Sequence, residues 1–202
     1  MALKVLEKDK FMRESSEWVK YAKDQAERPP RKTGAELISL LKEHGVRNVI
    51  DIGCGGGRNS IFLAKEGFDV TGVDFSEVSL GILKNKIKAG KIENIHLLLG
   101  EGNKIPVKDR TFDAATCHFV LDLQFGRDEQ KTMINEIYRA LKPNGVAVLE
   151  SLFTDKEVEE VRNRLKNAGF ILLDDRLSKI ISLGEGRSKN DWVFIAEKSK
   201  QA

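Results

Sequence analysis

Short apolar runs alternate with helical patterns through the middle of this chain. Five such runs lie at about residues 46–52, 68–74, 94–99, 113–119 and 145–150, and all are rich in Val, Ile and Leu. Apolar runs of this length are typical of strands that are buried on both faces of a sheet. Helical patterns separate most of the runs, and this βα alternation predicts an α/β fold with a mostly parallel sheet.

The C-terminal part of the chain follows a different pattern. A capped helix is expected over 154–170, and two further apolar stretches follow at 170–180 and 191–198. A short loop joins the two stretches and leaves no room for a crossover helix between them. Such spacing predicts a final antiparallel pair of strands.

The N-terminal segment precedes the alternation. Phe11, Trp18 and Ala22 lie at helical spacing, which predicts an amphipathic helix. The sequence RPPR then ends that helix, because proline cannot continue it. We therefore expect an N-terminal helical segment over residues 1–32 and the main domain over 33–202.

The composition is that of a charged globular chain. Its 202 residues are enough for one sizeable core, with 41% hydrophobic and 32% charged residues. No apolar run approaches the roughly 20 residues that a membrane span needs, and the charged N-terminus does not resemble a signal peptide. A cytoplasmic protein with no membrane partner is expected. Two cysteines without a CxxC pair, and three histidines without ligand spacing, predict no metal site.

The net charge of +3 is unevenly distributed. Residues 1–32 hold nine Lys and Arg against six Asp and Glu, whereas the two signs balance over the rest of the chain. A dedicated nucleic-acid binder usually carries a concentrated basic face. The pattern argues against that class without excluding an anionic substrate.

Glycines are concentrated just after the first of the apolar runs, in the sequence VIDIGCGGGRNS at residues 49–60. We call residues 53–57 the glycine turn. Glycine costs entropy on folding, but it allows a sharp turn, a positive φ and close approach of the backbone to a ligand. The turn lies where a strand ends and a helix begins. Ligands of open parallel sheets bind at such ends, where free helix N–H groups point at them.

Three motifs could account for the glycine turn. The P-loop motif GxxxxGK[ST] is absent from the chain. The dinucleotide motif GxGxxG fits only weakly, because counting from Gly53 puts Arg58 where the third glycine belongs. The pattern DxGxGxG fits throughout, at Asp51, Gly53, Gly55 and Gly57.

That pattern resembles motif I of the class I S-adenosylmethionine (SAM)-dependent methyltransferases. The resemblance continues in order through VTGVDFSE, GEGNKIPVKDRTFDAATCHFVLDL, LKPNGVAVLE and LKNAGF. Small methyltransferases of the tellurite-resistance and ubiquinone-biosynthesis type are the subgroup it resembles most. The resemblance implies a Rossmann-like, seven-stranded, mostly parallel sheet in the order 3-2-1-4-5-7-6, with strand 7 antiparallel, helices on both faces and an N-terminal helical lid. It also implies SAM as cofactor and S-adenosyl-L-homocysteine as product.

The resemblance further implies a set of cofactor-binding residues. Asp74, at the end of the second strand, matches the acidic residue that binds both ribose hydroxyls, since a carboxylate accepts two hydrogen bonds from a vicinal diol. Asp51 would act from behind the glycine turn, on its amides or, through water, on the SAM ammonium. Glu101 stands where the family usually has an aspartate that contacts adenine, and Gly57 is expected to serve close helix packing. The implied set is Asp51, Gly53, Cys54, Gly55, Asp74, Phe75, Glu101, Gly102, Asn103 and Cys117.

Three residues are candidates for the acceptor side of the site. His118 ends the fourth strand, where the family presents a side chain to the acceptor, and it could act as a general base. Asp122 follows in the next loop, and Tyr21 lies on the N-terminal helix. Each has a plainer interpretation, as a hydrogen-bonded strand-end histidine, a solvated loop aspartate and a core aromatic residue.

The expected reaction is an in-line methyl transfer. The sulfonium of SAM is already an activated donor, so the protein has to orient an acceptor and exclude water. The acceptor pocket is expected from residues 1–32, 119–128 and 182–191. A small-molecule acceptor is the first expectation, and the [DNS]PP[YFW] motif of enzymes that methylate amino groups is absent. The alternatives are an RNA or protein acceptor, a non-catalytic SAM-binding protein and a nicotinamide oxidoreductase.

Overall fold

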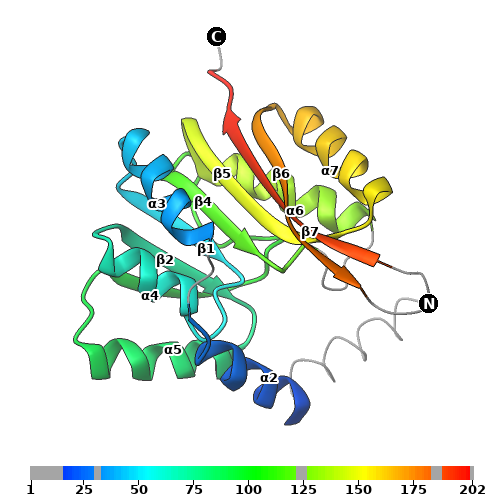
Figure 1. Cartoon of the computed structure of the whole chain (residues 1–202). Helices are drawn as coiled ribbons and strands as arrows, with labels where there is room; N and C mark the ends of the chain where they lie inside the picture. The colour runs from blue at the N-terminus through cyan, green and yellow to red at the C-terminus, as the bar shows by residue number, and fades with distance from the viewer. Residues whose placement is uncertain (1–15, 30–32, 122–126, 183–187, 201–202) are drawn as a thin grey trace.

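A seven-stranded sheet forms the centre of the molecule (Figure 1). The computed structural model describes residues 16–29, 33–121, 127–182 and 188–200. The strand order is β3-β2-β1-β4-β5-β7-β6, and β7 is antiparallel to both of its neighbours while the other pairs are parallel. This order and orientation confirm the prediction. The strands are β1 (Asn48–Ile52), β2 (Asp69–Asp74), β3 (Ile95–Leu99), β4 (Phe112–His118), β5 (Leu141–Phe153), β6 (Phe170–Ser182) and β7 (Ser188–Lys198).

Helices cover both faces of the sheet, as predicted. One face carries α3, α4 and α5, and the other carries α6 and α7 (Figure 1). Apolar side chains between the helices and the strands form two cores, one on each face. Within the described part of the chain no helix is both long and apolar enough to cross a membrane. The helices are α2 (Ser16–Ala26), α3 (Thr33–Glu43), α4 (Arg58–Lys65), α5 (Glu77–Gly90), α6 (Arg127–Ala140) and α7 (Asp155–Ala168).

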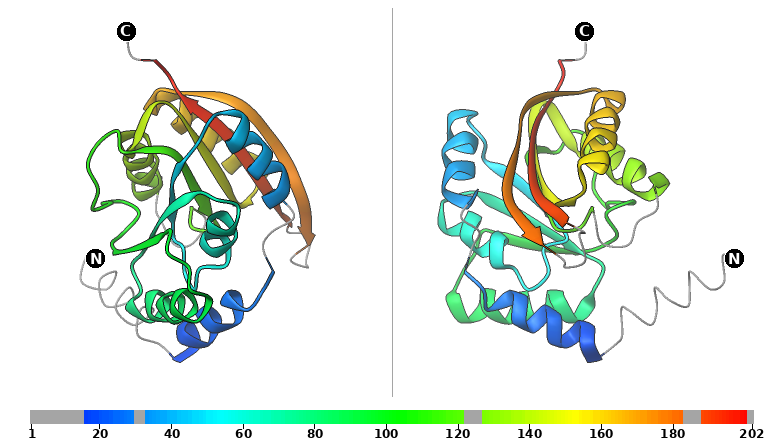
Figure 2. Two further views of the ribbon diagram at one scale, coloured as in Figure 1. Left: turned by 90° about the vertical axis from the view of Figure 1, so that its left-hand side faces the viewer. Right: turned by 45° about the vertical axis from the view of Figure 1, so that its right-hand side comes forward.

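The helix α2 lies along α5, close to the glycine turn (Figure 2). The Lys86 ammonium on α5 donates to the Ala26 carbonyl at 2.5 Å and pairs with Glu27 at 2.9 Å. Ala26 packs so closely on Gly56 that a Cβ on this glycine would lie 2.3 Å from the alanine methyl. The end of α2 is therefore held beside the glycine turn. The division at residues 1–32 and 33–202, and closure of the first part as a lid, stay predictions.

The strand β5 is longer than the sequence indicated. A strand was expected at about 145–150, whereas β5 begins at Leu141 and ends at Phe153. Leu141 already pairs with Phe112 of β4, and Asn144, with a φ of 62°, lies in the register shift that follows. The sequence LKPNG, which has the composition of a turn, is thus accommodated as an irregularity within the strand. Pairing with β7 continues to the end of β5.

Gly57 shows why one position of the glycine turn must lack a side chain. It is the N-cap of α4, with a φ of 83°. A Cβ there would lie 2.1 Å from the nearest methyl of Leu83, which is fully buried on α5. The expected role of Gly57 in helix packing is therefore confirmed.

The variant Gly57→Ala should lose about 2 to 4 kcal/mol of unfolding free energy, because it combines left-handed backbone strain with an overpacked contact. Gly81→Ala is the matched control, since Gly81 lies inside α5 with open space around its missing side chain. That variant should gain about 0.5 to 1 kcal/mol. Urea unfolding measures both. Equal stability of the two variants would contradict the packing argument.

Candidate functional site

The glycine turn is held over the ends of β1 and β2 by backbone and carboxylate contacts. The Gly53 N–H donates to the Val73 carbonyl at 2.8 Å, which draws the turn towards β2. The Gly55 N–H then donates to one oxygen of Asp74 at 2.8 Å, and the Ser76 N–H donates to the other at 2.9 Å. Both Gly53 and Gly55 have a positive φ, of 71° and 53°. One carboxylate therefore joins the glycine turn to the start of α5.

Asp74 is buried but keeps hydrogen-bonding capacity. Burial raises the pKa of the Asp74 carboxyl, while the N–H groups of Ser76 and Gly55 act in the opposite direction. Each carboxylate oxygen has two lone pairs, so the backbone N–H groups of Gly55, Ser76 and Phe75 do not use all of the capacity of the carboxylate. Phe75 follows directly and is half-buried. The geometry is compatible with the expected contact of Asp74 to a vicinal diol.

Asp51 makes different contacts from those expected. Its two oxygens accept from the Ser60 hydroxyl at 2.5 Å and from the Thr116 hydroxyl at 2.9 Å. Ser60 lies on α4 and Thr116 on β4, so Asp51 links three elements beneath the turn. Burial raises the pKa of the Asp51 carboxyl, and the nearby imidazole of His118 lowers it. The direct partners of Asp51 are hydroxyl groups of side chains.

The loop after β3 contributes the residues expected on the adenine side. Glu101 is exposed and forms an isolated bridge with Lys104. Gly102 packs on α6, where a Cβ would lie 2.6 Å from the Met133 methyl, and Asn103 is half-buried. These residues lie at the same edge of the sheet as Asp74, because β2 and β3 are parallel neighbours.

Both cysteines are buried. Cys54 lies against Gly72 of β2, and Cys117 lies inside β4. Burial raises the pKa of the Cys54 thiol well above its ordinary value, and the negative charges of Asp74 and Asp51 raise it further. Such a thiol is a small packing residue rather than a nucleophile. The described side chains include no group of three or more His, Cys, Asp or Glu residues that could hold a metal ion.

His118 lies at the end of β4, as predicted, and pairs with a carboxylate. Its Nδ1 atom is 2.8 Å from an oxygen of Glu150, and the side chains are 7% and 1% exposed. The two residues are direct partners in the register of β4 and β5. A carboxylate can only accept, so Nδ1 carries the hydrogen in this contact and Nε2 of the neutral ring is an acceptor. Asp122 and the side chain of Tyr21 lie outside the described residues.

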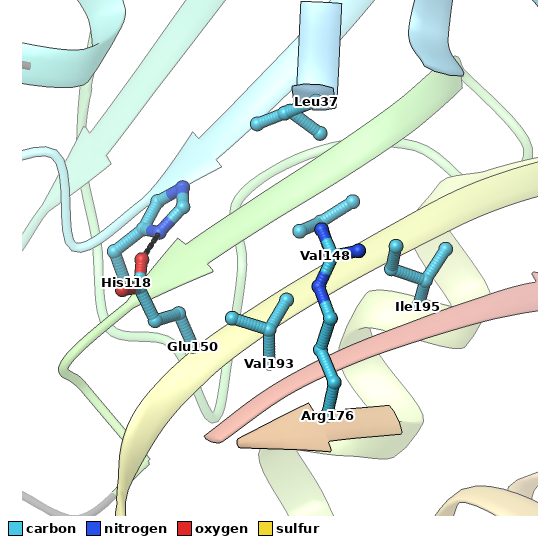
Figure 3. Close-up of a pocket in the computed structure, with 7 residues that line it drawn as sticks. All are labelled: Leu37, His118, Val148, Glu150, Arg176, Val193 and Ile195. Atoms are coloured by element: carbon cyan, nitrogen blue, oxygen red, sulfur yellow. Dashed lines mark hydrogen bonds and ion pairs between the residues drawn. The ribbon is translucent and has the colours of Figure 1, made fainter. Parts of the chain in front are cut away.

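A pocket opens beside this histidine (Figure 3). The imidazole of His118 lies on one side of it, and the side chain of Arg176 rises from β6 on the other. Four aliphatic residues complete the lining, namely Leu37, Val148, Val193 and Ile195. The pocket thus combines apolar walls with two nitrogen-rich groups and a buried carboxylate.

Sequence analysis missed most of this lining. None of the pocket residues belongs to the segments 1–32, 119–128 or 182–191, from which the acceptor pocket was expected. Glu150 had a detectable signal, because a carboxylate ends an apolar strand there just as it does at Asp51. Arg176 had none, since it lies among other charged residues of an alternating strand.

Comparison with known proteins identifies the same domain. A family model described as a methyltransferase domain matches residues 49–145, a little under half of the chain. The demethylmenaquinone methyltransferase of Listeria welshimeri is 34% identical over 113 residues, which cover 54% of this chain and 47% of that protein. The chain therefore spans about half the length of the curated relatives it matches.

Solved structures show the same fold. A SAM-dependent methyltransferase from Clostridium acetobutylicum superimposes with a TM-score of 0.72 at 14% identity, covering 87% of this chain and 94% of that one. The magnesium protoporphyrin IX methyltransferase of Synechocystis PCC 6803, solved with bound SAM, gives 0.64 at 24% identity, covering 83% and 79%. The matched domain and the strand order together show that residues 49–145 resemble a methyltransferase domain and that the chain has the fold of SAM-dependent methyltransferases of known structure.

Proposed function

We propose that this protein transfers the methyl group of SAM to a small-molecule acceptor. The observation that carries the proposal is the meeting of the glycine turn with the Asp74 carboxylate over the ends of β1 and β2. The curated relatives act on demethylmenaquinone, and the Synechocystis neighbour acts on magnesium protoporphyrin IX. Both are small molecules, and the pocket beside His118 has largely apolar walls, as small-molecule sites do.

The cofactor would lie across the carboxyl ends of the first three strands. Asp74 would accept hydrogen bonds from the two ribose hydroxyls, and the glycine turn would place backbone groups against the methionine part. Phe75 and the loop Glu101–Asn103 would contact the adenine. Asp51 supports the turn from below through α4 and β4, and Cys54 and Cys117 allow close approach because their side chains are small.

The chemistry would rest on orientation. SAM supplies an electrophilic methyl group, and the chain has to place the acceptor nucleophile in line with the S–CH₃ bond. Water has to be excluded meanwhile. The end of α2 lies against Gly56, which supports the proposal that the N-terminal segment, residues 1–32, closes over the cofactor. A cytoplasmic location, which the charged composition supports, is part of the same proposal.

The first test is calorimetric titration with S-adenosyl-L-homocysteine. We expect wild-type protein to bind it with a micromolar dissociation constant, and Asp74→Asn to bind about tenfold to a hundredfold more weakly, because a charged acceptor for two hydroxyls is lost. Asp69→Asn is the matched control, since Asp69 lies exposed at the other end of β2. That variant should bind as the wild type does.

The outcomes separate the alternatives. No binding to the wild type, together with binding of NADH, would favour the oxidoreductase interpretation and contradict the proposal. Binding without transfer of a labelled methyl group to any acceptor would favour a non-catalytic SAM-binding protein. Transfer to added RNA or protein would move the acceptor to the macromolecular class.

Binding should also weaken in acid, and Asp74 should be the reason. The ionised carboxyl accepts the ribose hydroxyls, whereas the protonated form has lost part of that capacity. Burial raises the pKa of Asp74 in the free protein, so protonation begins at a higher pH than for an exposed aspartate. Below that pKa the affinity should fall by up to about tenfold per pH unit. Titrations over a pH series, with Asp74→Asn as the pH-insensitive reference, measure this; an equal decline in the variant would assign the effect to another group.

A further inference from the structure

Four adjacent strands place a row of side chains on the α3 face of the sheet. His118 of β4 pairs with Glu150 of β5, Glu150 pairs with Val193 of β7, and Val193 pairs with Arg176 of β6. Direct cross-strand partners project to the same face. The register therefore fixes His118 and Arg176 at the two ends of one row, with the pocket between them (Figure 3).

The His118–Glu150 pair leaves a proton acceptor facing the pocket. The Glu150 carboxylate is buried and holds the hydrogen on Nδ1, so the lone pair of the neutral ring is on Nε2. Figure 3 shows Nε2 turned away from Glu150. The groups that face this ring are Glu150 from β5 and, through its charge, Asp51 from β1. Both are acidic, and neither occupies Nε2.

Arg176 brings a positive charge to the opposite wall. Its guanidinium is 3.6 Å from Asp174, and both side chains are more than two-fifths exposed. Arg176 also lines the pocket, where an anionic oxygen of a bound molecule would meet its positive charge. The fork of N–H donors suits such an oxygen.

The remaining walls restrict the acceptor further. Val148, Val193 and Ile195 are buried on the sheet, and Leu37 of α3 faces them. Aliphatic walls above and below favour a flat apolar ring. An amine would meet the like charge of Arg176 once protonated, and a carboxylic acid would need no base. A weakly acidic hydroxyl uses both the base and the guanidinium.

From this arrangement we infer that the pocket binds a phenolic or enolic hydroxyl on a flat apolar ring and that His118 removes its proton, with Glu150 as a positioning residue. This inference rests on the proposed function. The hydroxyl proton moves to Nε2 of His118, and the oxygen electron pair forms the new C–O bond with the methyl carbon. The S–CH₃ bond breaks with its electron pair returning to sulfur, which leaves a methyl ether and S-adenosyl-L-homocysteine. Arg176 stabilises the developing oxygen anion.

A chromophoric phenol tests binding and deprotonation without requiring turnover. Protein saturated with S-adenosyl-L-homocysteine is titrated with 4-nitrophenol, at a pH just below that at which the free phenol ionises. We expect the absorption band of the phenolate to appear on binding. His118→Gln should bind the phenol without that band, and Arg176→Gln should bind it about tenfold more weakly. 4-Nitroaniline, with the same ring and an amino group, should bind at least about tenfold more weakly than the phenol.

Two surface residues supply matched control variants. His96 is an exposed histidine 3.4 Å from Asp69, so His96→Gln removes a histidine–carboxylate pair far more exposed than that of His118. Arg47 is exposed and directly precedes β1, at the end of that strand opposite to the glycine turn. Neither His96→Gln nor Arg47→Gln should change the titration.

The role of Glu150 has its own readout. In ¹⁵N NMR of imidazole-labelled protein, His118 should show a hydrogen on Nδ1 and none on Nε2. Glu150→Gln should lose this fixed preference, because an amide can donate as well as accept. A variant that unfolds at the wild-type temperature but has the altered tautomer supports a positioning role; an unchanged tautomer overturns it.

The results also separate this inference from the proposed function. Failure to bind S-adenosyl-L-homocysteine would reject the methyltransferase proposal and the inference with it. Binding of that product without binding of 4-nitrophenol would overturn the inference alone. A phenolate band that persists in His118→Gln would assign the proton to another group and overturn the role of His118.

Discussion

The buried carboxylate of Asp74 is the contact on which the arrangement of the site depends. It receives one N–H from the glycine turn and one from the first turn of α5, at 2.8 and 2.9 Å. A desolvated carboxylate is costly without such partners, so the two loops are held where they satisfy it. The same contacts leave lone pairs for a ligand. One residue therefore both shapes the glycine turn and offers the acceptor of hydrogen bonds that a ribose needs.

Three strands of the sheet carry a buried carboxylate near their carboxyl ends, and the partners of each decide what it can do. The Asp51 carboxylate accepts hydrogen bonds from two side-chain hydroxyls and so connects β1 to α4 and β4. Asp74 is satisfied by backbone N–H groups and keeps capacity for a ligand. Glu150 is paired with an imidazole, so it acts on the pocket through His118. The same kind of group on three strands thus has three different sets of partners, because the neighbouring elements differ.

Sequence analysis predicted those features that depend on residues close together in the chain. The βα alternation and the position of His118 follow from runs of apolar residues, and the strand order follows from the resemblance that the motifs carry. The start of β5 was missed, because pairing of Leu141 with Phe112 overrides the turn-like composition of LKPNG. The prediction that the acceptor pocket comes from residues 1–32, 119–128 and 182–191 stays a prediction, and the pocket that the structure describes owes its polar groups to His118, Glu150 and Arg176. Arg176 and His118 are far apart in the sequence, and the pairing of β4 with β5, β5 with β7 and β7 with β6 places them on one row. No local sequence pattern predicts these pairings.

The contrast between local motifs and strand pairing also limits what can be inferred about the acceptor from related proteins. The domain that the family model matches ends at residue 145, so it includes Asp51, Asp74 and His118 but stops before Glu150 and Arg176. The residues that we propose to bind the cofactor therefore lie within or beside the matched part of the chain. The opposite wall of the pocket comes from β5, β6 and β7, beyond the match. A relative that shares this histidine can carry a different partner residue on these strands, and the chemistry of the histidine changes with that residue. The last three strands place a carboxylate behind His118 and a guanidinium across from it, and the proposed acceptor preference depends on both groups.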